Sequence, residues 1–204
     1  KDISSGYNSK PRYKNLALHG LSWDVSKRLN FSLYEMVVYQ ASDTLSQRGI
    51  DLAYANPIIF YRPAEFGNGS ADNVLIGFSF KWKATKKQQI YGQLLLDEFV
   101  LSEYRQNHGW WANKFGVQLG FKSFDNFIEG LHLQSEVNIA RPFTYTHGSV
   151  LQNYGHMNES LAHPLGANFI EWVTHLKYLG KKWRIHEEFI WAIYGRDING
   201  ENLG

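Results

Sequence analysis

The 204-residue sequence contains no cysteine, which excludes disulfide bonds, thiolate metal sites and thiol catalysis. Its formal net charge of +2 is too small to indicate nucleic-acid binding. No apolar run approaches the roughly 18–20 residues of a membrane-spanning helix. There is no Gly-x-Ser-x-Gly, P-loop or dinucleotide-binding motif, and no signal peptide follows Lys1. We therefore expect a non-enzymatic chain without a cofactor, and a mature, trimmed or internal stretch of sequence.

The stretch Val74–Val100 predicts a β-hairpin with one apolar and one polar face. Apolar side chains alternate with lysine, serine and glycine over 74–84, and a period of two places successive side chains on opposite sides of a strand. Thr85-Lys86-Lys87 forms a short turn, with Trp82 beside it. Such hairpins repeat around the wall of transmembrane β-barrels. Aromatic residues make up 16% of the chain, as expected for barrels with aromatic rings at the membrane–water boundary.

The same alternation predicts about eight strands in a single all-β domain, residues 1–204. They are Asn15–Val25, Leu29–Gln40, the two arms of the 74–100 hairpin, Lys114–Phe124, Phe127–Ala140, Phe169–Gly180 and Trp183–Gly195. The connections alternate between short turns at 26–28, 85–87, 125–126 and 180–182 and long loops at 41–73, 101–113 and 141–168. Outer-membrane barrels have short periplasmic turns and long outer loops. The pattern therefore predicts an antiparallel transmembrane β-barrel in a bacterial outer membrane.

One face of the strand 127–140 carries four successive polar side chains. Each polar group buried without a partner costs roughly 1–3 kcal/mol, so a packed core would not accept this face, whereas a water-filled or loop-plugged lumen would. The side chains predicted to line the lumen are His132, Gln134, Glu136, Asn138, His186 and Glu188. A soluble β-sandwich is the alternative fold, but it leaves the lysine- and glutamine-lined faces unexplained.

The predicted strand directions place both ends of the sequence on the long-loop side. A complete barrel of this type is expected to begin and end in the periplasm. The sequence also ends at Gly204 in a stretch rich in glycine and asparagine, and no aromatic strand follows it. We therefore expect these residues to be an internal segment of a larger barrel.

Several blocks of the sequence resemble the Wzi-type capsule-assembly and RemB-like gliding-motility outer-membrane proteins of Bacteroidetes. The blocks are AYANPIIFYRP (53–63), YGQLLLDEF (91–99), GWWANKFGVQLGFK (109–122), VNIARPFTYTH (137–147) and ESLAHPLGANFIEW (159–172). The resemblance implies a longer outer-membrane β-barrel. For the capsule branch it also implies a surface lectin that holds capsular polysaccharide, and for the gliding branch a role at the surface or in the motility apparatus.

Loops carry specificity on a barrel scaffold, so the candidate ligand-binding residues lie in the three long connections. A sugar site needs an exposed ring for stacking, with carboxylates, amides or guanidinium groups around it. The candidates of these types are Tyr61, Arg62, Glu65, Tyr104, His108, Trp110, Trp111, Arg141, Tyr145, His147, His156 and Asn158. The alternative for each of them is that it packs the loops together inside the barrel mouth.

Three functions are compatible with these patterns. Aromatic rings and arginine in the loops favour polysaccharide binding or capsule organisation at the surface. Apolar loop stretches such as Pro57–Phe60 favour an interaction subunit that docks other envelope proteins of a motility or secretion machine. An open lumen lined by charge would favour a passive diffusion channel. No metal site is predicted, because the spacing of His147, His156 and His163 fits no usual ligand pattern. The expected partners are membrane lipid, surface polysaccharide and envelope proteins.

Overall fold

The computed structural model describes residues 13–40, 51–52, 54–55, 72–98, 113–156 and 159–195. Their main feature is an eight-stranded antiparallel sheet in the order β1-β2-β3-β4-β5-β6-β9-β10. The strands are β1 (Lys14–Ser26), β2 (Leu29–Gln40), β3 (Asn73–Trp82), β4 (Gln88–Glu98), β5 (Lys114–Phe124), β6 (Leu131–Ala140), β9 (Phe169–Leu179) and β10 (Arg184–Tyr194). The all-β antiparallel fold is confirmed, and two of the predicted strands, 29–40 and 114–124, have the bounds that alternation gave.

β1 and β10 form the two edges of this sheet, and within the described residues they do not pair with each other. Closure into a barrel therefore stays a prediction. Between β6 and β9 the chain adds a short 3₁₀ helix, η1 (Val150–Gln152), and a two-stranded sheet of β7 (Gly155–His156) and β8 (Glu159–Ser160). Alternation did not predict these small elements. Within the described residues, no helix has the length and hydropathy to cross a membrane.

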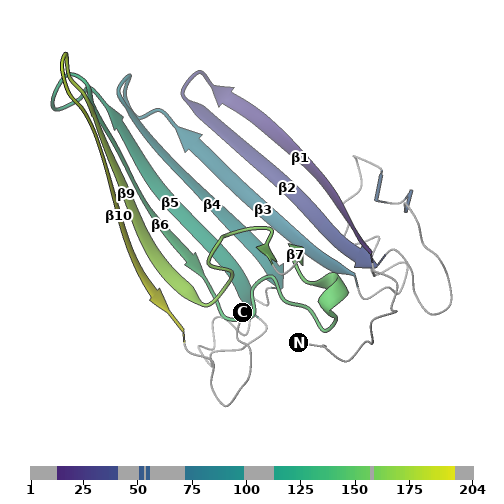
Figure 1. The fold of residues 1–204 in the computed structure, drawn as a ribbon. Helices are drawn as coiled ribbons and strands as arrows, with labels where there is room; N and C mark the ends of the chain where they lie inside the picture. Colours follow the sequence, from purple (N-terminus) through teal and green to yellow (C-terminus); the bar gives the residue numbers. More distant parts are fainter. Residues whose placement is uncertain are drawn as a thin grey trace.

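The four short turns within the eight-stranded sheet, β1–β2, β3–β4, β5–β6 and β9–β10, lie at one end of it, at the top of Figure 1. Strands β2, β4 and β6 end at the opposite end. The turn between β5 and β6 is longer than predicted, because β6 begins at Leu131 rather than Phe127. Asp125 closes this turn: its backbone N–H donates to the Leu131 carbonyl at 2.9 Å, and its Oδ1 accepts from the Gly130 N–H at 2.8 Å. Asp125 and Gly130 both have positive φ, which lets the chain reverse here.

The strand register gives the sheet one apolar face across all eight strands. One row of paired residues crosses the sheet as Leu21, Leu33, Phe78, Leu94, Val117, Ile139, Ile170 and Ile193. The next row toward the short turns is Trp23, Phe31, Phe80, Gly92, Leu119, Val137, Trp172 and Trp191. These side chains stay largely open to the surroundings: Leu21 is 70% exposed and Leu119 is 55% exposed. We call this surface the apolar face.

The opposite surface, which we call the polar face, carries hydroxyl, amide and charged side chains. Its central row is Ser22, Ser32, Ser79, Gln93, Gln118, Asn138, Glu171 and Ala192. The facing that alternation predicted for β3, β5 and β6 is confirmed by this register.

Among the described residues, the apolar face is covered near its long-loop end on β2 and β3. There Tyr54 packs with Val37, Tyr39 and Val74, and its hydroxyl donates to Asp72 Oδ2 at 2.7 Å. Glu35 also lies on this face, 3% exposed, with its carboxylate 3.6 Å from His19 Nε2. Alternation along β2 places this carboxylate among apolar side chains, and its pairing with His19 accounts for how it is accommodated.

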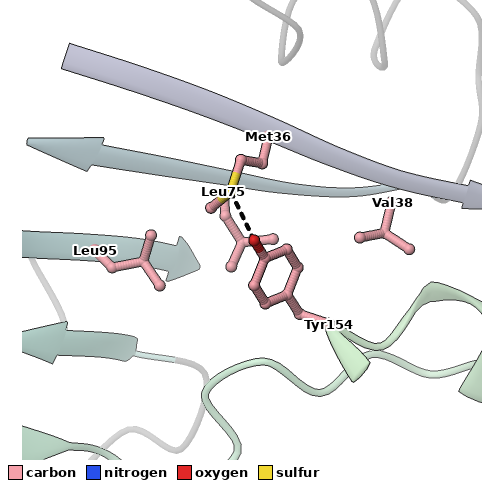
Figure 2. Close-up of a cluster of buried hydrophobic side chains, with 5 residues drawn as sticks. All are labelled: Met36, Val38, Leu75, Leu95 and Tyr154. Atoms are coloured by element: carbon pink, nitrogen blue, oxygen red, sulfur yellow. Dashed lines mark hydrogen bonds between the residues drawn. The ribbon is translucent and has the colours of Figure 1, made fainter. Parts of the chain in front are cut away.

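Of the buried clusters among the described residues, the largest lies on the polar face, beneath the connection between β6 and β9 (residues 141–168). Figure 2 shows the Tyr154 ring of this connection pointing into the space between Met36, Leu75 and Leu95, with its hydroxyl donating to the Met36 sulfur at 2.9 Å. Val38 completes the cluster. The third long connection therefore folds back onto the polar face and forms a core with it.

Candidate functional site

A chain of hydrogen bonds runs across the centre of the polar face. The Tyr91 hydroxyl on β4 donates to Glu136 Oε2 on β6 at 2.6 Å, and Gln134 Nε2 donates to both groups at 3.1 and 3.3 Å. Asn138 Nδ2 donates to Glu136 Oε1 at 3.3 Å. Three of the residues predicted to line a lumen are therefore joined in one network, and their polar groups have partners on the surface of the sheet.

The network continues from β6 into the β6–β9 connection. Asn138 Nδ2 donates to Glu171 Oε2 on β9 at 3.0 Å, and the same oxygen lies 3.0 Å from His163 Nε2. The His163 ring packs against the Phe169 ring, with centroids 4.4 Å apart and an interplanar angle of 31°. A buried carboxylate, an amide and an imidazole therefore link the sheet to the loop that covers it.

Glycines give the tyrosine rings room to lie flat on the polar face. A Cβ at Gly120 would lie 2.2 Å from Tyr91 Cζ, and a Cβ at Gly77 would lie 2.0 Å from two ring carbons of Tyr34. No side chain other than hydrogen fits beneath either ring, so these two glycines set the positions of the rings. The Lys122 ammonium lies 5.0 Å from the centroid of the Tyr91 ring, within cation–π range.

A basic groove of about 590 Å³ lies on the polar face near the short turns of β1 to β5. Its cationic lining residues are Lys27, Arg28, Lys81, Lys83 and Lys122. Asp24 is the one acidic lining residue among those that the structure describes, and the other polar lining side chains include Ser22, Asn30, Ser32, Ser79, Gln89, Tyr91, Gln93 and Gln118. Five cations beside one carboxylate favour anions, while the hydroxyl and amide groups can exchange hydrogen bonds with a hydroxylated ligand.

The long-loop end of the polar face is occupied by the β6–β9 connection, which every strand from β1 to β5 holds through a hydrogen bond. Figure 1 shows this connection in green beside the strand ends. The bonds are Lys14 Nζ to the Asn153 carbonyl (2.9 Å), Gln40 Nε2 to Ser149 Oγ (3.1 Å), Asn73 Nδ2 to the Gln152 carbonyl (3.0 Å), the Tyr145 N–H to Asp97 Oδ2 (2.9 Å) and Lys114 Nζ to the Thr146 carbonyl (3.0 Å).

Tyr145 is a half-buried residue among the predicted ligand-binding residues that the structure describes. It has a φ of 75°, lies 6.1 Å from the Tyr154 ring and packs against two buried clusters. Burial, together with the nearby Tyr34, Asp97 and Tyr154, raises the pKa of the Tyr145 hydroxyl to about 12. Burial also raises the pKa of Tyr154. Both rings pack the connection against the sheet, so Tyr145 matches the alternative role of a packing residue.

The other described candidates do not gather into one ligand site. The Arg141 guanidinium lies 5.6 Å from the Phe115 ring centroid. The His147 N–H donates to Asn153 Oδ1 at 2.6 Å, and its Nδ1 lies 3.0 Å from Gln152 Oε1. His156 is exposed on the short strand β7. These contacts hold the connection together, and they leave only His156 as an open side chain.

Eight predicted ligand-binding residues lie outside the described residues. They are Tyr61, Arg62, Glu65, Tyr104, His108, Trp110, Trp111 and Asn158. Sequence reasoning missed the basic groove, because it looked for specificity in the long loops only. The sequence does contain the signal. Lys81 lies on the polar side of β3, Lys83 follows two residues later, and Lys122 lies on the polar side of β5. The adjacent short turns are also rich in lysine.

Six residues predicted to line a lumen all lie on the polar face. Lys177 on β9 lies opposite both His132 on β6 and His186 on β10. His175 on β9 lies opposite both Gln134 on β6 and Glu188 on β10.

Comparison of the chain with protein-family models, curated proteins and solved structures found no match, so the resemblance to capsule-assembly and gliding-motility proteins stays a prediction.

Proposed function

We propose that this chain forms part of the wall of a bacterial outer-membrane β-barrel, with a non-enzymatic role in binding surface polysaccharide. The observation that carries the proposal is the apolar face, which stays exposed across eight hydrogen-bonded strands. Soluble monomers rarely expose contiguous apolar patches larger than a few hundred Å². Lipid is the partner that suits rows of leucine, isoleucine, valine, phenylalanine and tryptophan that cross a hydrogen-bonded sheet.

The distribution of tryptophan also supports contact of the apolar face with lipid, with the short turns at one membrane boundary. Trp82 and Trp183 lie at the short-turn end, and Trp23 is three residues from the end of β1. Their exposed fractions are 45%, 73% and 63%. Indole rings favour the boundary between hydrocarbon and water, because they combine an apolar body with an N–H donor. The short turns would then be periplasmic and the long connections would reach the cell surface.

The polar face would line the interior of the barrel and carry the binding chemistry. Its basic groove offers ammonium, guanidinium, hydroxyl and amide groups in a volume of about 590 Å³. A polysaccharide with acidic groups presents matching carboxylates or phosphates together with many hydroxyls. The resemblance to capsule-assembly proteins points to the same ligand class, with the long loops, including Trp110 and Trp111, as a second place for contact.

Binding of the detergent-purified full-length protein to surface polysaccharide from its own cell tests this proposal. Binding that falls in Lys81→Gln and Lys122→Gln would support the groove, and binding that falls in Trp110→Ala and Trp111→Ala would support the loops. Lys86→Gln is the matched control, because Lys86 is an exposed lysine in the adjacent turn that does not line the groove. If wild-type protein binds no polysaccharide, the proposal fails, and a pull-down would test docking to other envelope proteins.

A second candidate function, passage of small anions, is favoured by the position of the groove. The β6–β9 connection covers the long-loop end of the polar face, where its hydrogen bonds to the strands lie. The lysine-lined groove lies at the other end, near the short turns, away from these hydrogen bonds. Conductance across a planar bilayer, with anion over cation selectivity that falls in Lys81→Gln, would support a channel. Absence of conductance in reconstituted wild-type protein would exclude it.

A further inference from the structure

Two histidines and a glutamate meet on the polar face of the β9–β10 hairpin. His175 on β9 lies directly opposite Glu188 on β10, and His186 lies two residues before Glu188, on the same side of that strand. One ligand atom from each residue lies within 4.8 Å of the other two. In the part of the chain that the structure describes, this is the one group of three or more histidine, aspartate or glutamate side chains close enough to share an ion.

The distances suit the donors of a single first-row metal ion. His175 Nδ1 and Glu188 Oε2 are 3.6 Å apart, and two donors on one tetrahedral zinc ion, each about 2.0–2.1 Å from the metal, lie about 3.3 Å apart. The rings of His175 and His186 are nearly parallel, with an interplanar angle of 27° and centroids 6.1 Å apart. The three donor atoms all lie within 4.8 Å of one another, so side-chain rotations that draw them closer would let them share one ion.

A cavity beside the cluster provides space for the ion and an additional ligand. It has a volume of about 300 Å³, and His175 and His186 both line it, together with His132 and Gln134 on the neighbouring strand β6. Three protein donors with an open side toward water are typical of zinc sites that keep a fourth position for an exchangeable ligand. Imidazole and carboxylate donors suit zinc, copper, nickel and iron.

We propose that His175, His186 and Glu188 form a binding site for a divalent first-row transition metal, with Zn²⁺ as the reference ion. Lys177, which pairs with His186 across the hairpin, and Lys122 line the same cavity. Their positive charges oppose cation binding and attract an anionic fourth ligand. The site lies on the polar face whatever ligand the groove binds, so it does not depend on the proposed polysaccharide function.

The test is a titration of untagged, chelator-treated protein in detergent with Co²⁺, followed by competition with Zn²⁺. We expect one Co²⁺ per chain in the micromolar range, with visible d–d absorption, and displacement by Zn²⁺. His175→Ala, His186→Ala and Glu188→Gln should each weaken binding at least about tenfold, since each removes a donor. Lys177→Gln should tighten Co²⁺ binding severalfold, because it removes a nearby positive charge. If the cluster bound anions instead, the same variant would lose affinity for the anion.

Two histidine variants are the matched controls. His132→Ala removes an imidazole that lines the same cavity outside the cluster, and His156→Ala removes an exposed imidazole elsewhere. Both should bind Co²⁺ as the wild type does. Near-ultraviolet circular dichroism of each metal-free variant checks that the fold is kept. The proposal is overturned if wild-type protein binds no Co²⁺ in the micromolar range, if the double variant His175→Ala/His186→Ala binds normally, or if His132→Ala loses as much affinity as the donor variants.

Discussion

Arginine in place of Leu119 is the sharpest test of a membrane-facing apolar surface. Leu119 is the sixth of the eleven residues of β5, so it lies at the middle of the strand. Eleven residues at about 3.3 Å each span about 36 Å, and a tilt of about 40° reduces this to about 28 Å along the bilayer normal, close to the height of a barrel's apolar band. Leu119 would therefore sit near the bilayer midplane, with 55% of its surface open to lipid.

Leu119→Arg should lower the free energy of unfolding from lipid vesicles by roughly 2–4 kcal/mol, the cost of arginine on the lipid face at this depth. If the apolar face met water instead, a substitution at so exposed a position would change stability by no more than about 0.5 kcal/mol. Urea unfolding followed by tryptophan fluorescence separates the two cases.

The neighbouring variant Gln118→Arg is the control, because Gln118 points to the polar face and lines the basic groove. It places the same side chain at nearly the same height, and we expect a much smaller loss of stability. Equal effects of Leu119→Arg and Gln118→Arg, or no effect of Leu119→Arg in lipid, would refute the proposed orientation of the sheet.

Three further predictions concern the polar face. Gly120→Ala should destabilise the fold by about 1–3 kcal/mol in urea unfolding, because a Cβ there would lie 2.2 Å from Tyr91 Cζ. Tyr154→Ala should cost about 3–5 kcal/mol and speed amide hydrogen exchange in 144–156, because it empties the buried cluster of Figure 2. Alkaline pH should loosen the same segment: the raised pKa of Tyr145 gives stability that is full below pH 10.0 and lost as pH rises through about 12.

Each of these predictions has its own control. The cost of Gly120→Ala should shrink in a Tyr91→Ala background, and an equal cost in both backgrounds would show that the ring does not cause it. For the cluster, Tyr154→Phe should lose only about 0.5–1.5 kcal/mol, since it keeps the ring and removes one hydrogen bond. For the alkaline transition, Tyr145→Phe cannot ionise, so an unchanged pH profile of exchange in this variant would contradict the assignment.

Alternation predicted the strands well because a half-exposed sheet imposes a period of two on every strand. It predicted the bounds of β2 and β5 correctly. In β5 apolar and polar residues alternate nearly to the end, whereas in β2 the alternation holds only over the first half of the strand. It placed the start of β6 four residues early, because Phe127 and Ile128 are apolar residues of a turn, and both are exposed. An apolar pair in a turn at a membrane boundary cannot be told from strand residues by periodicity alone.

The candidate site was harder to predict, because its contacts join residues far apart in the sequence. Tyr154 and Met36 are 118 positions apart, and no local pattern announces their contact. The proposed metal site is an intermediate case: once the turn is placed at 180–183, the register sets His175 opposite Glu188. The sequence pattern singled out His147, His156 and His163 in the loops, whereas the contact of His175 with Glu188 across the hairpin required the register.

The five anchors of the β6–β9 connection also restrict sliding of the strands past one another. A strand can slip only in steps of two residues if its faces are to be kept, and such a step moves its end by about 7 Å. Anchors on β1, β2, β3, β4 and β5 hold five consecutive strand ends against a single stretch of chain, residues 145–153. A slip of any one strand would break its hydrogen bond to the connection as well as its hydrogen bonds to the neighbouring strands. The connection therefore fixes the register of these five strands relative to one another.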